Sequence, residues 1–583
     1  VDYSPKFSII LTTKNPAVHL TPDLCSRVTL VNFTVTPASL QSQSLSRIVK
    51  AEKPDLESQR ANLLKLQGEQ NVKLRELEDQ MLASISAVEG NILDDDRVVD
   101  GMEVLMKEGS QVEEQISKST EVMKQVQTAV GKFEPLANIC RDLFVLLEAM
   151  REMSFLYEFS SNSFMAVLEY VLNSPRQEGQ SEEDRTNSIK TQLFGELAAR
   201  VGRGLQGEDK MVFALLLARV FTGKHDIGSE KSDSTMDIIG TITEIFGADF
   251  PWSGRGLNSL KSIQSSEMSS SVPLMLCGAP GHDVSGRVES MAREMKKELA
   301  SVAMGSPEGY EAAEKYVATA SKRGTWVMLK NCHLCTDWLR ETLVKKLQSL
   351  GASTHPDFRV FITSEISPKL PTALLRISDI IVAEAPTGVK ASLSRFLSSI
   401  SAERLQNPVR NRLYLCLAWV HAVVQERLRY VPIGWSESYE WTEADALHAL
   451  DVIDALTDSA SGGRQQLDPE KLPFDAIRST LCTGVFGGRV TVDADQKVLD
   501  KLVEHVFTTK CFDVNFKLVD VDGAPALPDG STPEDIFAWI ESLPEHTPPT
   551  WIGLDSEAEA VRELKLAETV ERKVGIVGAL LVP

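Results

Sequence analysis

One stretch of the chain, residues 276–288, has the residue types that bind phosphate groups. LCGAPGHDVSGRV follows an apolar run and leads into a helix-like stretch, which is where phosphate-binding loops lie. Aligned with the pattern Gly-x4-Gly-Lys-Ser/Thr, it supplies Gly281, Gly286, Arg287 and Val288. Arginine replaces the lysine, and valine has no hydroxyl to ligate Mg²⁺. The pattern leaves two readings open, a turn that binds nothing and a loop that binds nucleotide weakly.

The residues at the end of the next expected strand also bear on metal-dependent hydrolysis. A hydrolytic site needs an acidic pair there to hold Mg²⁺ and orient water, but WVMLKNCHLC places Lys330 and Asn331 at the strand end. A lysine cannot coordinate Mg²⁺, and asparagine cannot act as a base. We therefore expect no hydrolysis at this site.

Two other apolar runs end in polar clusters, as the sensor strands of ring ATPases do. FRVFITSEI ends at residues 363–365, FSIILTTKN ends at residues 12–15, and each is followed by an arginine, Arg27 or Arg376. An arginine in such a position can reach the phosphates bound by a neighbouring module and stabilise transferring charge. The alternative for both residues is a surface or structural ion pair.

The cysteines and histidines do not form a convincing site. Cys332 and Cys335 have CxxC spacing, but no second pair follows at zinc-ribbon distance, so we expect no bound metal. His421 lies in an apolar helix, which is typical of a hydrogen-bonded core residue. The eight cysteines are too sparse for a disulfide scaffold and are expected to be reduced thiols.

The elements that would position these residues alternate between strand and helix. Apolar runs at 272–277, 326–331, 358–364 and 380–385 are separated by helix-like stretches, which predicts a doubly wound parallel sheet. FSIILTT at 7–13 also has the pattern of a buried parallel strand. Longer helical patterns occupy 135–220 and 391–510, so the fold class is α/β plus α.

Residues 54–130 have a different composition, rich in Gln, Glu, Lys and Leu. Apolar residues recur at spacings of three and four from Leu74 to Ile92, and sevenfold registers follow between 102 and 130, which predicts two coiled-coil arms. The intervening EGNILDDD would form the tip of an antiparallel hairpin, with the polar residues Glu89, Asn91, Asp94, Asp95 and Asp96. An ordinary helical bundle is the alternative.

Bulk composition limits the possible partners. With 583 residues and 43% hydrophobic content, the chain can fill several cores. A formal net charge of −21 argues against nucleic acid, anionic membranes and direct docking on an acidic filament. We find no signal peptide or membrane-spanning pattern.

Nine phrases, in order, resemble the C-terminal portion of dynein heavy chains, and those of cytoplasmic dynein most closely. They are KFSIILTTKNP, LCSRVTLVNFTVT, GNILDDD, APGHDVSGRV, GTWVMLKNCHL, DFRVFITSEISPKLP, WVHAVVQERLRYVPIGWSESYEW, FGGRVTVDADQKVL and TPPTWIGL. The resemblance implies an AAA+ P-loop-type α/β subdomain with helical subdomains, an antiparallel coiled-coil strut and a small C-terminal domain.

The resemblance also implies a division of the chain. Residues 1–53 would end the large subdomain of the fifth AAA+ module and begin its helical subdomain, 54–134 would be the strut (buttress), and 135–175 would continue that helical subdomain. Residues 176–390 would be the large subdomain of the sixth module, 391–510 its helical subdomain, and 511–583 the C-terminal domain.

The implied function is mechanical. This section of the ring would transmit ATP-driven conformational change to the microtubule-binding stalk of a minus-end-directed motor, and it would have no complete ATPase site. ATP or ADP with Mg²⁺ would bind in neighbouring modules. The partners would be the linker, stalk and other modules of the heavy chain, the intermediate and light chains and, indirectly, the microtubule, all in the cytoplasm. The alternatives are a weakly nucleotide-binding or active AAA+ ATPase module and a coiled-coil scaffold.

Two features depart from the family. The polar stretch between Thr222 and Asp237 is shorter than the resemblance leads us to expect, so residues are missing there or the sixth module is incomplete. The chain also lacks the linker, the first four modules and the stalk. It would be a fragment, or one subunit of a heavy chain split over two polypeptides.

Overall fold

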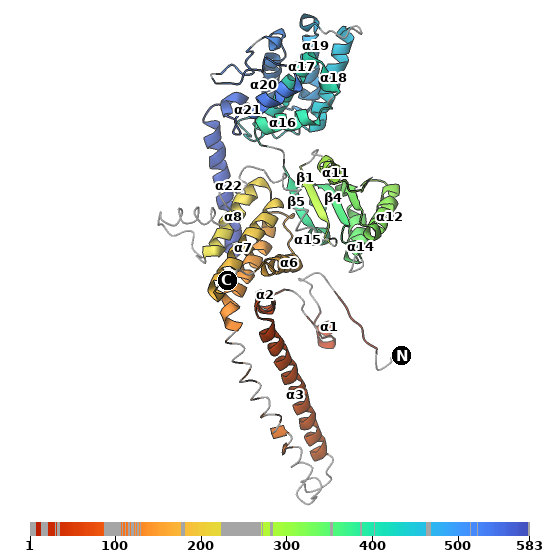
Figure 1. Ribbon diagram of the computed structural model, residues 1–583, viewed down its shortest axis with the longest axis vertical. Coiled ribbons are helices and arrows are strands. Elements are labelled where there is room, and N and C mark those ends of the chain that lie inside the picture. Colours follow the sequence, from red (N-terminus) through yellow and green to blue (C-terminus); the bar gives the residue numbers. More distant parts are fainter. Residues whose placement is uncertain are drawn as a thin grey trace, which may run out of the picture. The chain divides into compact units, whose positions relative to one another are not determined.

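The computed structural model describes most of the chain and divides it into two compact units (Figure 1). One unit is Val1–Val145 with Ser161–Leu193, and the other is Leu146–Ser160 with Phe194–Pro583. The described residues are 7–12, 21–29, 31, 35–86, parts of 106–130, 131–175, 181–222, 270, 272–279, 284–349, 354–384, 387–401, 403–461, 468–513, 515–521 and 523–580.

The first unit is built around two consecutive helices, α2 (Pro37–Glu52) and α3 (Pro54–Ser86). The Thr36 hydroxyl accepts from the Ser39 N–H and starts α2, and Lys53 separates the two helices. Pro54 sets the break because proline cannot donate a helical hydrogen bond but fits well at the first position of a new helix.

The long helix α3 is exposed along most of its length, and Leu77 is its one buried residue among those whose side chains are described. Leu77 on α3 and Val112 in the helical residues of 106–130 are only 6% and 5% exposed. The side chains of Met81 and Ile85 and the whole predicted tip, residues 89–96, lie outside the described residues. The predicted antiparallel strut over 54–134 therefore stays a prediction.

Further helices complete the first unit. They are α1 (Pro22–Arg27), α6 (Ser161–Leu172) and the parts of α5 (Glu134–Ala149) and α7 (Glu182–Arg203) that belong to this unit. One of them, α6, contacts α2. The core includes Leu40, Ile48 and Leu136, each at most 1% exposed. Burying these aliphatic side chains stabilises the unit through the hydrophobic effect.

The strand predicted at 7–13 is wrong for the described residues. Phe7–Thr12 is irregular, and Phe7, Ile9 and Ile10 are 57%, 70% and 84% exposed. A parallel strand needs neighbours to pair its backbone N–H and C=O groups. None of the described strands pairs with this segment.

The second unit contains the predicted parallel sheet, in the order β2-β3-β4-β1-β5. Its strands are β1 (Leu274–Gly278), β2 (Leu299–Ala303), β3 (Trp326–Lys330), β4 (Arg359–Glu365) and β5 (Asp379–Ala383). All four pairings are parallel, so the predicted α/β fold is confirmed. The strand β2 was not predicted from the sequence because LASVA is a partly exposed edge strand without a strong apolar run.

Helices surround this sheet, as Figure 1 shows: α11 (Ser285–Glu294), α12 (Pro307–Arg323), α14 (Val344–Ser349) and α15 (Thr372–Ile377). Leu276, Trp326 and Phe361 form the centre of the α/β core, and each is at most 2% exposed. In α12 the Ser306 hydroxyl accepts from the Gly309 N–H, and Gly324 ends the helix in a left-handed conformation.

A second core in this unit is entirely helical. Its main elements are α16 (Val389–Ser399), α17 (Pro408–Leu428), α18 (Glu443–Ser461), α19 (Phe474–Ser479), α20 (Asp493–Val506) and α21 (Pro533–Ser542). One hydrophobic cluster runs from Val389 to Ala558 and contains the buried Trp419 and Trp435. It crosses the predicted domain boundary at 511, and that boundary stays a prediction.

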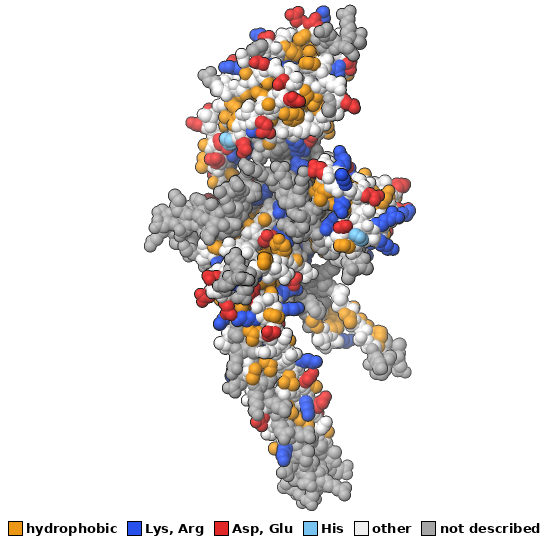
Figure 2. All heavy atoms as spheres, viewed as in Figure 1, with side chains coloured by type: hydrophobic (Ala, Val, Ile, Leu, Met, Phe, Trp, Pro, Cys, Tyr) orange, Lys and Arg blue, Asp and Glu red, His pale blue; other side chains and the backbone are white. Residues whose placement is uncertain are grey.

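The last helix, α22 (Ala558–Leu580), packs on α8 (Gly207–Thr222). Asp209 of α8 is 2% exposed; its carboxylate accepts from the Tyr157 hydroxyl and the Lys573 ammonium, each at 2.5 Å. Among the described helices, none is long and apolar enough to cross a bilayer. On the face drawn in Figure 2, acidic and basic side chains are interspersed.

Candidate nucleotide site at the carboxyl edge of the sheet

The candidate loop connects β1 to α11, and its residues 280–283 lie outside the described part of the chain. The sheet order places β4 between β1 and β3, so the carboxyl ends of all three strands meet at one edge. Gly281 lies outside the described residues. Gly286, Arg287 and Val288 lie in the first turn of α11, which begins at Ser285.

Gly286 and Val288 have surroundings that are typical of an ordinary strand-to-helix turn. A Cβ added at Gly286 would meet no atom of the described residues within 4 Å, so none of these residues requires a glycine there. Val288 is fully buried and belongs to the same core as Leu276 and Phe361. Its side chain therefore packs inward, against the sheet.

Arg287 occupies the position of the phosphate-binding lysine but lies near charges on the helical part of this unit. Burial lowers the pKa of Arg287 first, the nearby charge of Arg395 on α16 lowers it further, and Glu443 on α18 opposes both. Arg395 and Glu443 pair at 2.9 Å. The Arg287 guanidinium thus lies within electrostatic reach of a pair on two other helices.

Lys330, at the end of β3, is paired with α11. Its Nζ donates to Glu289 Oε1 at 2.6 Å, and both side chains are about one third exposed or less. Asn331 follows in a left-handed conformation with φ of 57°, and its N–H donates to Thr363 Oγ1 at 3.3 Å. The two residues predicted at the acidic-pair position therefore lie in one network with α11 and β4.

The polar end of β4 is occupied by internal hydrogen bonds. The Glu365 N–H donates to His333 Nδ1 at 3.2 Å, and His333 Nε2 lies 3.7 Å from the Glu365 carboxylate. This geometry assigns the proton of neutral His333 to Nε2. Ser364 donates from Oγ to the Glu365 carbonyl at 2.9 Å.

The CxxC pair lies behind this edge in the protein interior. Cys332 and Cys335 are 0% and 4% exposed, and their thiols donate to the backbone carbonyls of Leu329 and Cys332. Burial raises the pKa of the Cys332 thiol, and its hydrogen bond with Cys335 raises it further. All eight cysteines are free thiols.

The two candidate arginine fingers lie in different units and have different surroundings. Arg376 on α15 donates from Nε to Glu158 Oε2 at 2.8 Å, and Arg151 pairs with the same carboxylate at 3.0 Å. Glu158 is 4% exposed, so Arg376 neutralises a buried charge. Arg27 is exposed in the last turn of α1, and no acidic partner is found for it among the described residues.

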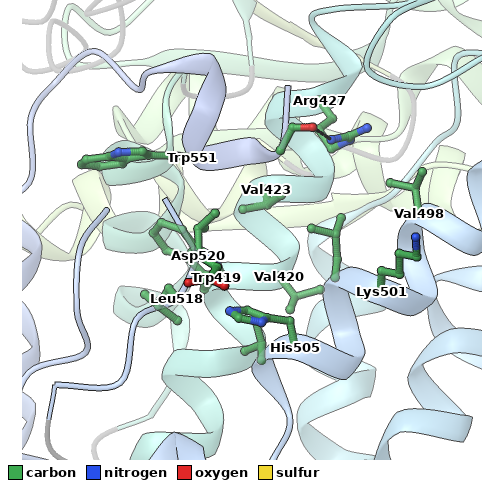
Figure 3. A pocket seen from close by; sticks show the side chains of 14 residues that line it. Trp419, Val420, Val423, Arg427, Val498, Lys501, His505, Leu518, Asp520 and Trp551 are labelled. Atoms are coloured by element: carbon green, nitrogen blue, oxygen red, sulfur yellow. Dashed lines mark hydrogen bonds between the residues drawn. The ribbon is translucent and has the colours of Figure 1, made fainter. Parts of the chain in front are cut away.

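A cavity that we did not predict from the sequence lies between α17 and α20 (Figure 3). It has a volume of about 340 Å³, and its walls include Trp419, Val423, Leu518 and Trp551. Lys501 and Asp520 also line it. The lining residues come from four separated segments, so the spacing of residues along the sequence carried no signal for this cavity.

Three family models match separate parts of the chain. Residues 1–112 match the ATP-binding dynein motor region, 269–382 match the dynein heavy chain region D6 P-loop domain, and 410–558 match the dynein heavy chain AAA lid domain. The second match covers the sheet with the candidate loop, and the third covers most of the helical core.

Proteins named "Dynein heavy chain, cytoplasmic" are similar over almost the whole chain. The Drosophila melanogaster and Dictyostelium discoideum proteins are 34% and 35% identical over 96% of it. The Paramecium tetraurelia protein is 36% identical over 98%. The chain spans only 14–15% of the length of these relatives. From its motifs, its fold and these matches, the chain belongs to the cytoplasmic dynein heavy chain family and forms part of the AAA motor region.

Proposed function

We propose that this chain passes ATP-driven conformational change toward the microtubule-binding stalk and has no complete ATPase site of its own. The observation that carries the second part is the Lys330–Glu289 ion pair. Lys330 is a cation at the position where a carboxylate would have to hold Mg²⁺. The carboxylate of Glu289 on α11 is paired with this lysine.

The residues present do not fit a magnesium nucleotide. Val288 is buried against the sheet and has no hydroxyl to offer a metal ion. Arg287 lies near Arg395 and Glu443 and so within reach of the helical lid. Val288 is therefore used in packing, and Arg287 is half-buried near a charged pair of other helices, so neither residue supports a catalytic step at this edge of the sheet.

In this proposal, ATP and Mg²⁺ act in other modules of the heavy chain. The chain would work with the linker, the stalk, the remaining modules, and the intermediate and light chains, and it would act indirectly on the microtubule in the cytoplasm. The names of the matched relatives, which are cytoplasmic dynein heavy chains, support this assignment. The whole motor extends well beyond this chain, because the chain spans only 14–15% of those relatives.

We propose the domain division inferred from the sequence: fifth module to 53, strut at 54–134, fifth module helices at 135–175, sixth module at 176–390, its lid at 391–510 and the terminal domain at 511–583. The exposed apolar segment Phe7–Leu11 supports the first assignment, because such side chains are expected to be covered by further parts of a large subdomain.

We also propose different roles for the two arginines. Arg27 is exposed, and it would reach nucleotide held by the preceding module of the ring. Arg376 would be structural, because it neutralises the buried Glu158. If Arg376 moved away, the buried Glu158 carboxylate would keep only Arg151 as its cation, which makes a second role for Arg376 costly.

The test of the missing ATPase site is titration of the purified chain with fluorescent ATP and ADP in the presence of Mg²⁺, together with a turnover assay. We expect neither saturable binding nor phosphate release. Mg²⁺-dependent hydrolysis would overturn the proposal. A matched variant combines Arg287→Lys, Val288→Thr, Lys330→Asp and Asn331→Glu. Nucleotide binding that appears only in this variant would identify these positions as the cause of the loss.

A further inference from the structure

In the first unit, one carboxylate contacts the bases of both helical arms. Lys53 precedes the first residue of α3, and Lys132 follows the helical residues of the returning segment 106–130. Glu182, in the first turn of α7, pairs with both: Lys53 Nζ lies 2.6 Å from Oε1 and Lys132 Nζ lies 3.4 Å from Oε2. Each oxygen therefore holds the root of a different arm.

The Lys53 ammonium also lies 5.9 Å from the centroid of the Phe133 ring, so it contacts the returning root a second time. Phe133 is 5% exposed, which holds that ring in a fixed position. Lys53 and then Lys132 lower the pKa of the Glu182 carboxyl. The charges of both roots thus favour the ionised form that binds them.

A second, more deeply buried pair lies one turn farther along α7. Arg185 Nε donates to Glu52 Oε1 at 3.0 Å, and the side chains are 6% and 10% exposed. The other end of the guanidinium donates to the Leu172 and Ser174 carbonyls at 3.3 and 3.1 Å. Arg185 therefore joins the end of α2 to the end of α6.

We propose that these five residues form a root clamp, which fixes the axial register of the two arms and makes them move with the start of α7. The clamp consists of Glu52, Lys53, Lys132, Glu182 and Arg185. Sliding one arm by a helical turn displaces its root by about 5.4 Å, which would break one of the Glu182 pairs. The inference rests on the proposed function, because it names the residues that would position the strut.

The clamp joins residues from separate segments of the chain, whereas the Lys65–Glu69 pair of the same arm joins two residues of one helix. Lys65 and Glu69 pair at 3.9 Å within α3, and their side chains are 78% and 64% exposed. An ion pair within one exposed helix contributes little to stability, and it does not depend on the position of another helix. It is the matched control for charge reversal.

The first test measures register directly in the chain. Spin labels replace Val72 on α3 and Val122 in the returning segment, both exposed, in a background with Cys25→Ser because Cys25 is the exposed cysteine. Electron–electron double resonance gives the distance between the labels. We expect one distance, a second population in Glu182→Lys, and restoration when Lys53→Glu and Lys132→Glu are added. An unchanged distribution in Glu182→Lys overturns the clamp.

The second test uses the heavy chain that contains this segment. We expect Glu182→Lys to lower microtubule stimulation of the ATPase by about fivefold or more, with basal turnover retained and stimulation recovered in the triple charge swap. The double variant Lys65→Glu, Glu69→Lys should behave as wild type. A shifted register with full stimulation would leave the clamp in place and overturn the proposed strut function. Loss that the swap does not rescue would overturn the clamp's part in coupling.

Discussion

The buried histidine of the helical core should make this part of the chain less stable in mild acid. His421 on α17 is 4% exposed and lies between the rings of Phe396 and Phe486. Its Nδ1 has no hydrogen-bond partner among the described residues. Burial lowers the pKa of His421 to about 4; Asp445 opposes this shift and Arg395 adds to it. The sequence correctly indicated a core residue but not the unsatisfied nitrogen.

The direction of the effect follows from proton linkage. Well above pH 6.5 the imidazole is neutral in both the folded and the unfolded state, and pH has little effect on stability through this residue. As pH falls from 6.5 toward 4, the unfolded chain binds a proton that the folded chain excludes, so the free energy of unfolding falls. A shift from 6.5 to about 4 amounts to about 3 kcal/mol in total. Between pH 7.5 and 5.0 the loss should be about 2 kcal/mol.

The assay is denaturant unfolding followed by tryptophan fluorescence at pH 7.5 and 5.0, since Trp419, Trp435 and Trp441 belong to the same core. Other groups also titrate, so the informative quantity is the difference from His421→Gln, which stays neutral throughout. We expect this variant to lose about 2 kcal/mol less than wild type over that pH range. His448→Gln removes an exposed imidazole on α18 and is the control. If His421→Gln and wild type lose the same stability, the reasoning is refuted.

Two further predictions concern the candidate loop and the last helix. Val288→Thr should destabilise the chain by about 1–3 kcal/mol in denaturant unfolding, because it buries a hydroxyl in an apolar core. Ser290→Ala on the exposed side of α11 is the control, and an equal effect would contradict a core role for Val288. Lys573→Met leaves the Asp209 carboxylate buried without its cation, which should weaken α22 docking by about 3–5 kcal/mol. The measurement is amide hydrogen exchange, which should become faster in α22 of Lys573→Met and stay unchanged in the control Lys565→Met. Unchanged protection of α22 in Lys573→Met would argue against a docking role for the Lys573–Asp209 pair.

Much of the α/β fold could be predicted because buried parallel strands are continuous apolar runs. β3 and β4 lie within one residue of the ranges expected from WVMLKN and FRVFITS. The edge strand β2 was not found, because an edge position needs no strong apolar run and LASVA has none. The same rule predicted a strand at residues 7–13, since the pattern cannot tell whether neighbouring strands are present.

The candidate site also has features that the sequence could predict and features that it could not. The residue types at 287, 288, 330 and 331 alone argue against metal-dependent hydrolysis, since no packing can give valine a hydroxyl or lysine a lone pair for Mg²⁺. Where those side chains go instead could not be predicted. The Lys330–Glu289 pair joins residues 41 positions apart, and Arg287 lies near charges on α16 and α18.

The sequence by itself determined the family, the class of fold and the chemical types at the candidate site, because these depend on local patterns and on the atoms each residue carries. Tertiary structure alone decided that Glu182 faces both Lys53 and Lys132, and that the core around Trp419 continues past residue 511. Such contacts bring distant segments together. They depend on which helix faces are buried against one another, and spacing along one segment does not encode that.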